Sequence, residues 1–403
     1  MKPLFFDLRT LPARHELRHG LTPLHLRRWS QIHRRRRLHR DPLFRSSRAE
    51  VIRVLRGFEW DTTLPVRPAA DPQLLRAVAW NIERGKRFDA LLGLLTHEPE
   101  LAGADLFFLT ELDIGMGRSE NRNIPRELAE ALGLHYVFAN QHIVLAPGDS
   151  GEQHVKAPNT LAMHGCALLS RYPIRRFAAV TLPERLDKFR ALEKRLGHKR
   201  AILAEIELPD GPIGVAVVHL DPFASARHRA AQLARILSAA EHLHVDRLLL
   251  GGDLNTTTYD FTNALGLSIN IAHKLLRFGF AGTIEQYMTP DRVFERPVFR
   301  VLERHGLTVD AFNDRERGTI YYDANDPELI AKTLAYIPKP LWRWMQRRLE
   351  PWGGRIPLRF DWFAGRGLRP VRPRVLERPC WGGTHISDHN PIFVDIALDP
   401  AAT

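Results

Sequence analysis

Acidic, amide and imidazole side chains interrupt the apolar runs of this sequence at six places. The six are Trp80-Asn81-Ile82-Glu83, Leu109-Thr110-Glu111, Val218-His219-Leu220, Gly252-Asp253-Leu254-Asn255, Phe360-Asp361-Trp362 and Ser387-Asp388-His389-Asn390. Burying ionised carboxylates beside one another is unfavourable unless a cation or hydrogen-bond donors compensate. Asn, Asp and Glu supply hard oxygen ligands that suit Mg²⁺ or Mn²⁺, whereas Zn²⁺ sites prefer His and Cys. These residue types favour a site that binds a divalent cation and hydrolyses a phosphate ester.

Each of these residues, taken singly, also has a structural interpretation. A helix cap, a turn or a hydrogen-bonded core histidine is favoured for any one of them by about two to one. Alternate residues of a strand share a face, so Asn81 and Glu83 point the same way, as do Asp253 and Asn255. Six such interruptions in one chain favour a common site over six separate structural roles.

The positions lie among segments that alternate between expected strands and helices from residue 74 onward. The apolar patterns predict strands at 75–80, 105–110, 164–170, 201–208, 213–220, 247–250 and 391–396, and helices at 86–97, 125–132 and 225–243. Pro209-Asp210-Gly211-Pro212 is a strong hairpin signal between two of these strands. Mixed strands and helices without strict alternation predict an α/β protein whose sheets contain antiparallel pairs, with helices outside.

The positive charge of the chain is concentrated at its beginning. The 403 residues contain 58 Lys and Arg against 46 Asp and Glu, a formal net charge of +12. Residues 1–60 hold 15 of the basic and 5 of the acidic groups, a net of +10, so the other 343 residues carry +2. The densest run is Arg34-Arg35-Arg36-Arg37. Such a run attracts polyanions, either nucleic-acid phosphates or an anionic membrane surface; a solvated tail or a dock for an acidic partner is about equally favoured.

We expect residues 1–72 to form a basic extension and linker. The apolar spacing at 49–58 predicts a short amphipathic helix, and the proline-containing stretch 62–72 is typical of a linker. No apolar run approaches the roughly 18 residues that a membrane span needs. Two cysteines, Cys166 and Cys380, cannot form a disulfide framework. We therefore expect a cytoplasmic protein, with peripheral attachment to a membrane as the alternative.

The ordered segments WNIE, FLTELD, HGCALLSRYPI, VVHLD, GGDLN, RFDWF and SDHNPI resemble the endonuclease/exonuclease/phosphatase (DNase I-like) superfamily, in particular its general bacterial members. The resemblance covers about residues 74–398 and implies a domain at 73–399 with an elaborated segment at about 256–356. The implied fold is a four-layer α/β sandwich, two packed mixed β-sheets flanked by helices, with the site at one end. It also implies Mg²⁺ or Mn²⁺, with Glu111 as the principal ligand and Asn81, Glu83 and Asp388 binding or surrounding the cation.

The same resemblance implies roles for five further residues. Asp253 would orient or deprotonate the attacking water, and Asn255 would position water or phosphate. His389, held by Asp361, would contact a phosphoryl oxygen, and His219 would act on the phosphate or the leaving group. A carboxylate hydrogen-bonded to imidazole favours the imidazolium near neutral pH, which places a cation beside the phosphate.

The implied function is a metal-dependent phosphoester hydrolase, and our first hypothesis is a phosphodiesterase that cleaves nucleic acid. A phospholipid or sphingolipid head-group phosphodiesterase at an anionic membrane surface is one alternative, and a non-catalytic, polyanion-tethered binding module is another. The Trp- and Arg-rich segment 341–348 could stack on unpaired bases or anchor a helix at a lipid interface. The interpretation we rate somewhat above either is one helix that packs its tryptophans into the core.

Overall fold

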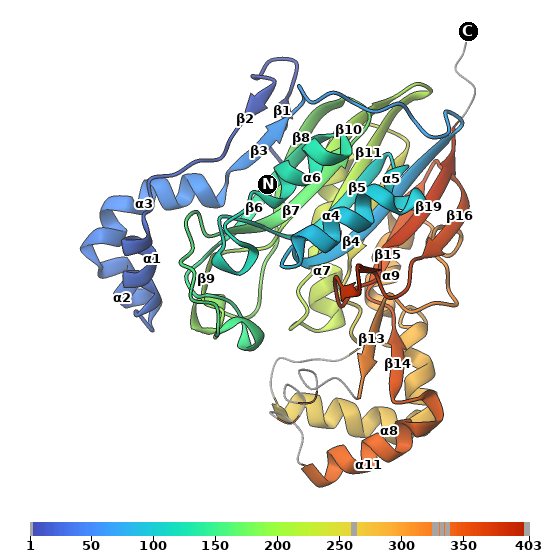
Figure 1. Ribbon diagram of the computed structural model, residues 1–403. Coiled ribbons are helices and arrows are strands. Elements are labelled where there is room, and N and C mark those ends of the chain that lie inside the picture. Colours follow the sequence, from blue (N-terminus) through green and yellow to red (C-terminus); the bar gives the residue numbers. More distant parts are fainter. Residues whose placement is uncertain (1–2, 259–263, 325–329, 331–333, 335–338, 399–403) are drawn as a thin grey trace.

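Two large mixed β-sheets pack face to face in the computed structural model of the chain, which describes residues 3–258, 264–324, 330, 334 and 339–398 (Figure 1). The first sheet has six strands in the order β1 (Phe6–Asp7), β8 (Ile174–Thr181), β10 (Arg200–Leu208), β11 (Gly211–His219), β12 (Leu248–Asp253) and β15 (Asp361–Arg366). The second sheet has the order β16 (Arg369–Val375), β19 (Ile392–Ala397), β4 (Leu74–Arg84), β5 (Leu106–Ile114), β7 (Met163–Ser170), β6 (His135–Val144), β3 (Phe58–Asp61) and β2 (Arg14–His15), with β9 (Arg195–Gly197) paired to β6.

The alternation of side chains along β4 shows how the layers form. Leu75, Ala77 and Ala79 belong to the apolar cluster between the two sheets, and Val78 and Trp80 belong to the cluster on the opposite face. Successive residues of a strand point to opposite faces, so an uninterrupted apolar run is buried on both. The strand therefore occupies the middle of the second sheet, with a neighbour on each side.

Helices cover the outer face of each sheet. The α-helices are α1 (Pro23–Ser30), α2 (Arg35–Arg40), α3 (Pro42–Leu55), α4 (Phe88–His97), α5 (Pro99–Ala102), α6 (Ile124–Leu132), α7 (Ala226–Ala240), α8 (Ala264–Met288), α9 (Arg296–Arg304) and α11 (Lys339–Leu349). Apolar residues of α4 and α6 pack on the second sheet, and those of α7 and α9 pack on the first. The expected four-layer sandwich is confirmed.

Short 3₁₀ helices connect several of these elements. They are η1 (Gly117–Ser119), η2 (Ser150–Glu152), η3 (Lys188–Arg190), η4 (Glu241–Leu243), η5 (Asp310–Phe312) and η6 (Glu350–Trp352). Gly133 ends α6 at φ 61°, the left-handed conformation that glycine adopts without steric cost, as the sequence predicts. Cys166 is buried and Cys380 is exposed, and both are free thiols.

The N-terminal residues differ from the expected extension, because they belong to both sheets. β1 pairs with β8 of the first sheet, and β3 pairs with β6 of the second. Trp29, Leu38 and Phe44 are buried in the same apolar cluster as the core of the second sheet. The expected helix at 49–58 is the end of the longer α3, whose N-cap Asp41 accepts a hydrogen bond from the Phe44 amide at 3.0 Å. Residues 62–72 contain no helix or strand.

The elaborated segment forms an insert with a small apolar cluster of its own. Ile284, Trp342, Leu349 and Ile356 are among its buried members. The ribbon of β13 (Ile320–Asp323) and β14 (Arg355–Leu358) joins the insert to the sandwich, and Figure 1 shows α8 and α11 at the far end of that ribbon. A second small ribbon is formed by β17 (Cys380–Trp381) and β18 (Thr384–His385). None of the helices in the described ranges has the length and apolar character to cross a membrane.

Candidate active site

Strand register aligns three of the polar residues at one end of the first sheet. His219, the last residue of β11, is the register partner of Asp253 in the parallel strand β12. Asp253 is in turn the partner of Asp361, the first residue of the antiparallel strand β15. Three neighbouring strands thus place an imidazole and two carboxylates side by side.

The carboxylate of Asp253 is held from several directions. Its Oδ2 accepts hydrogen bonds from the Asn255 side-chain amide at 3.0 Å and the Asn81 amide at 3.3 Å. Its Oδ1 accepts a bond from the Asn255 backbone N–H at 2.8 Å. Burial raises the pKa of Asp253 to about 7, and Asp361 adds to the rise while His389 opposes it. A carboxylate with such a pKa is suited to accept a proton near neutral pH.

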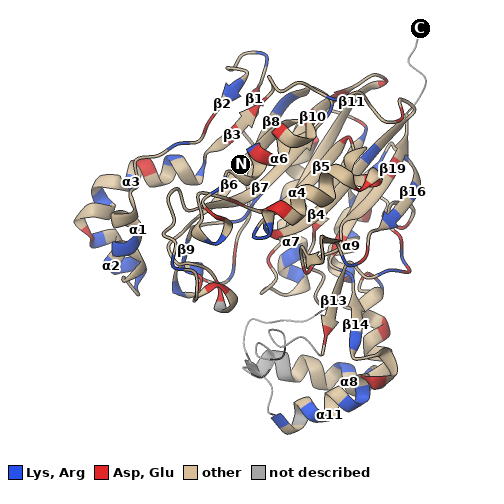
Figure 2. Ribbon diagram, in the orientation of Figure 1, with Lys and Arg blue, Asp and Glu red and all other residues tan. Residues whose placement is uncertain are grey.

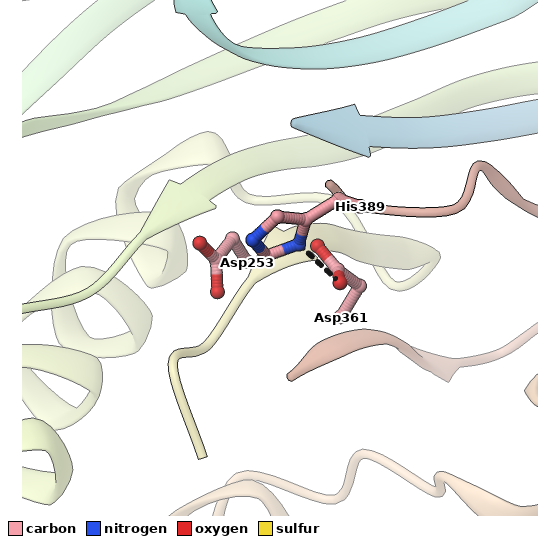
Figure 3. A group of neighbouring side chains, drawn as sticks. All are labelled: Asp253, Asp361 and His389. Carbon is pink, nitrogen blue, oxygen red and sulfur yellow. Dashed lines mark hydrogen bonds and ion pairs between the residues drawn. The ribbon is translucent and has the colours of Figure 1, made fainter. Parts of the chain in front are cut away.

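His389 lies between the carboxylates of Asp253 and Asp361 (Figure 3). Its Nδ1 donates to Oδ2 of Asp361 at 2.7 Å. Burial alone would lower the pKa of His389, but the charge and hydrogen bond of Asp361, with a contribution from Asp253, raise it well above the usual value. His389 is therefore the imidazolium of the site.

The loop that carries His389 is fixed to the second sheet. The Ser387 hydroxyl donates to the Asn81 carbonyl at 2.7 Å, and the Trp80 indole donates to the His389 carbonyl at 2.9 Å. A bridge between Ile320 and His389 attaches the same loop to the insert. The site is consequently assembled from both sheets and the start of the insert.

His219 is neutral, whereas His389 is cationic. Its Nε2 lies 3.4 Å from Oδ2 of Asp253 and 3.9 Å from Oε1 of Glu111. Burial, and then the nearby Lys199 ammonium, hold the pKa of His219 well below the usual value, in spite of Glu111. The site therefore contains one neutral and one cationic imidazole, which a sequence cannot distinguish.

Irregular backbone at two strand ends aims the acidic residues of the second sheet. The pairing of β4 with β5 shifts register between Asn81 and Arg84, and that of β5 with β7 shifts between Leu109 and Leu112. Glu83 and Glu111 have φ values of 46° and 58°, which lie in the left-handed region. Bulges of this kind redirect side chains next to active sites, and such φ values cost non-glycine residues energy.

Glu111 remains ionised in spite of its burial. Burial raises its pKa, but the charge of the Arg84 guanidinium outweighs that effect and holds the pKa of Glu111 well below its usual range. The side chain of Glu111 is 21% exposed and lies 3.8 Å from the Arg84 guanidinium. A partly exposed carboxylate that stays charged beside Asp253 and His219 fits a ligand for a divalent cation.

The other expected metal ligands differ in their availability. The Asn81 side-chain oxygen accepts a bond from the Glu83 backbone N–H at 3.1 Å. Both carboxylate oxygens of Glu83 are in ion pairs, one with Lys86 at 2.6 Å and one with Arg87 at 2.8 Å. Burial, and then the nearby Asp388 carboxylate, raise the pKa of Glu83. Asp388 itself is exposed, so it is the freer of these two carboxylates to face a cation.

One group in the described ranges places three possible ligand atoms within 4.8 Å of one another, and its members are Asp253, Asp361 and His389. In this group Nδ1 of His389 and Oδ2 of Asp361 are already bonded to each other. Oδ1 of Asp361 and Nδ1 of His219 are buried without a hydrogen-bond partner among the described residues. These two free polar atoms fit a site that receives water and a polar substrate, and the oxygen-rich donor set fits Mg²⁺ or Mn²⁺.

Two basic residues that the sequence motifs did not single out border the site. Arg84 contacts Asp149 at 2.9 Å and Glu193 at 3.6 Å, in addition to Glu111. Lys199 is 4% exposed, and burial lowers the pKa of its ammonium to about 8, although Asp253 and Glu111 oppose the change. The only sequence signal for Arg84 is its position directly after Glu83, and Lys199 precedes an expected strand by two residues.

A known family matches most of the chain. The Endonuclease/Exonuclease/phosphatase family matches residues 78–389, which include every candidate site residue described above. This chain belongs to that family. Members of the endonuclease/exonuclease/phosphatase family are generally phosphoester hydrolases, and the family is typically dependent on a divalent metal.

Several solved structures resemble the chain. An endonuclease/exonuclease/phosphatase from Beutenbergia cavernae DSM 12333 is 18% identical, with a TM-score of 0.46, over 82% of this chain and 72% of that one. The human Nocturnin catalytic domain with bound sulfate anion is 15% identical, with a TM-score of 0.42, over 86% and 98%. Truncated Caenorhabditis elegans TDP2 is 13% identical, with a TM-score of 0.42, over 80% and 97%. A search of curated proteins gave no match.

Proposed function

We propose that the protein is a Mg²⁺-dependent phosphodiesterase that hydrolyses nucleic acid, with Mn²⁺ as a substitute metal. The observation that carries this proposal is the arrangement of Asp253, His389 and Asp361, a raised-pKa carboxylate facing an imidazolium that a second carboxylate holds. Asp253 then serves as a proton acceptor and His389 as a cationic hydrogen-bond donor, and both can act at one phosphate group.

In the proposed reaction Asp253 accepts a proton from the attacking water while Asn255 holds the carboxylate in place. The His389 imidazolium donates to a phosphoryl oxygen, and Asp361 keeps it oriented and charged. The neutral His219 lies against Asp253 and Glu111, where it contacts the phosphate or the leaving group. The rate gain assigned to such a positioned acid or base is roughly 10²–10⁴-fold.

The metal would be held by Glu111 as principal ligand, with Asn81, Asp388 and Glu83 around it. The cation supplies charge neutralisation on the phosphoryl oxygens in the transition state. Arg84 keeps Glu111 ionised and thereby ready to bind. Of the three surrounding residues, Glu83 has to give up an ion pair with Lys86 or Arg87 to become a direct ligand.

Nucleic acid is the preferred substrate because the folded protein carries a basic surface on α2. Arg34, Arg36 and Arg37 are exposed, and α2 is part of the folded body. Arg35 contacts Asp187 at 2.6 Å, which attaches this helix to the segment that leads to Lys199. The arginines are thus held on the folded protein, where they support binding of a polyanion.

A lipid head-group phosphodiesterase is the second candidate, and one observation favours it. The insert that begins beside His389 exposes large apolar side chains, among them Leu276 at 88% exposure. The deciding experiment is a panel of single-stranded DNA, duplex DNA, RNA, sphingomyelin vesicles and inositol phosphates, each with Mg²⁺, with Mn²⁺ and with a chelator.

Release of nucleotides or shorter strands only when metal is present supports the nuclease, and release of head group instead supports the lipid enzyme. The Asp253→Asn variant accompanies every substrate, because it removes the proton acceptor with almost no change of shape. If no member of the panel is hydrolysed in a metal-dependent way, the result contradicts the proposed function and supports the non-catalytic binding module. A rate for Asp253→Asn equal to that of the unaltered protein contradicts the assignment of the base.

A further inference from the structure

The insert exposes aliphatic side chains along one side of α8. Ile269 is 60% exposed and Leu276 is 88% exposed. The two are seven residues apart, so they lie on the same face of the helix. Leu276 is more exposed than any other large hydrophobic residue among those described, and scattered single residues of this kind would need no explanation.

The neighbouring helix α11 also exposes a large apolar side chain, that of Trp344. Phe280 follows Leu276 across a break in α8 at Gly279 (φ 65°), and its ring centre is 5.6 Å from that of Trp344. Trp344 is 41% exposed. The small core of the insert is filled by other residues, including Ile284 and Trp342. Leu276 and Trp344 are therefore available for an external contact.

Basic residues surround this surface. The helix α11 contains Lys339, Arg343, Arg347 and Arg348 and has no acidic residue. Arg343, Arg347 and Arg348 are exposed, and the Arg348 guanidinium lies 5.6 Å from the centre of the Trp344 ring. Figure 2 shows the Lys and Arg residues, in blue, along α11. Exposed Leu, Ile and Trp beside arginines are the composition of a helix that lies in a bilayer interface.

We propose that the surface formed by α8 and α11 binds an anionic phospholipid bilayer. The aliphatic side chains decide between a bilayer and a nucleic acid, because Leu276 and Ile269 have no aromatic face on which a base could stack. Arginines attract the head groups and tryptophan prefers the interface, so the charge and the apolar side chains serve one partner. This inference goes beyond the proposed function and holds whichever phosphate ester is hydrolysed.

The bilayer would be held close to the site. The bridge from Ile320 to His389 fixes one end of the β13–β14 ribbon at the site. The ribbon is four residues long in each strand, so its far end, to which α11 leads, is about 10 Å away. The inferred contact therefore fixes the distance of the site from the membrane surface.

The test is co-sedimentation of the full chain with vesicles of phosphatidylcholine alone and of equal parts phosphatidylcholine and phosphatidylglycerol. Leu276→Glu is expected to lower binding to the mixed vesicles by about tenfold or more, because it replaces a buried apolar contact with a like charge to the lipid. The double variant Arg343→Glu/Arg347→Glu is expected to abolish the preference for phosphatidylglycerol. Circular dichroism melting curves confirm that each variant folds.

Leu24→Glu is the matched control. Leu24 is 68% exposed on α1, within the arginine-rich N-terminal helices. Its substitution by glutamate is expected to leave vesicle binding unchanged. Equal binding by Leu276→Glu and the unaltered chain overturns the proposal. Loss of binding in Leu24→Glu alone assigns the bilayer contact to the N-terminal helices instead. If Leu276→Glu weakens single-stranded DNA binding and leaves vesicle binding unchanged, the surface serves nucleic acid. None of these readouts uses catalysis, so they are independent of the proposed reaction.

Discussion

Nδ1 of His389 lies 2.7 Å from Oδ2 of Asp361, and Asp253 faces the other side of the same imidazole (Figure 3). An imidazole between two carboxylates keeps its proton, so His389 is a cation at the pH at which Asp253 is partly ionised. Because the two carboxylates belong to neighbouring strands, the strand register fixes both at once.

The first prediction concerns Asp361→Asn. The substitution keeps the shape of the side chain and removes its charge, so the pKa of His389 falls and less imidazolium is present. We expect kcat to fall by about 100-fold or more while the fold persists. Turnover of a nitrophenyl phosphodiester with Mg²⁺, together with a thermal melt, measures both. Asp310→Asn, at a position whose side chain is 88% exposed, is the control and should retain full activity. A fully active Asp361→Asn would exclude this role.

The second prediction concerns Arg84, which joins Glu111 to acidic residues from two other segments. Arg84→Met leaves Asp149, Glu193 and Glu111 without a shared cation, and we expect a loss of about 3–5 kcal/mol in the free energy of unfolding. Arg84→Lys should lose less, because it keeps the charge and loses only the forked geometry. Urea unfolding provides the measurement.

Arg87→Met is the matched control for that series. Arg87 also pairs with a carboxylate, that of Glu83, but its side chain is 40% exposed. Exposed pairs contribute about 0.2–1 kcal/mol, so this variant should be almost as stable as the unaltered protein. Similar losses of unfolding free energy for Arg84→Met and Arg87→Met would show that the burial of an ion pair does not determine its contribution to stability.

The sequence predicts the strand ends because each is a local event. Asp253 ends a short apolar run and His389 precedes one, and no long-range information is needed to notice them. The role of Arg84 cannot be predicted from the local sequence, because its partners, Asp149 and Glu193, are brought to it only by tertiary folding. The protonation states of the two histidines depend on neighbours from other strands for the same reason.

The N-terminal segment shows a different limit of sequence interpretation. Its arginines dominate the composition, and they conceal an apolar set that includes Trp29, Leu38 and Phe44. Two-residue strands such as β1 have no periodicity to detect. The net charge therefore describes the surface of these helices, whereas their burial was decided by a few large side chains.

The third prediction follows from that packing. Deleting residues 1–61 removes β1 and β3 and exposes their neighbour Phe177, so the truncated protein should unfold or aggregate. Gel filtration and circular dichroism detect either outcome. A soluble, folded and active truncation would show that the segment is dispensable.

The basic surface is better tested by charge removal. Arg34→Gln, Arg36→Gln and Arg37→Gln combined should leave the melting temperature unchanged and weaken binding to single-stranded DNA. The slope of log affinity against log salt concentration should become shallower by about 0.7 for each lost phosphate contact. An unaltered slope would show that these arginines face away from the nucleic acid.

The last prediction uses a buried histidine that has no part in the proposed chemistry. His142 is 1% exposed, and its Nε2 lies 3.5 Å from Oε2 of Glu184. Burial lowers the pKa of His142 to about 4 in spite of this carboxylate, whereas an unfolded chain has a histidine pKa near about 6.5. The unfolded state therefore binds the proton more readily. The stability that neutral His142 contributes is complete above the unfolded pKa and is lost as the pH falls toward the folded pKa.

Between about pH 7.5 and about pH 4.5 this difference amounts to about 2–3 kcal/mol of unfolding free energy. His142→Gln cannot titrate and keeps an amide that can donate to Glu184. Urea unfolding of both proteins at the two pH values should show that the unaltered chain loses about 2–3 kcal/mol more than the variant. Carboxylates elsewhere titrate in both proteins and cancel in the comparison. Parallel losses in the two proteins would place a protonated His142 in the folded state, paired with Glu184, and would contradict the prediction.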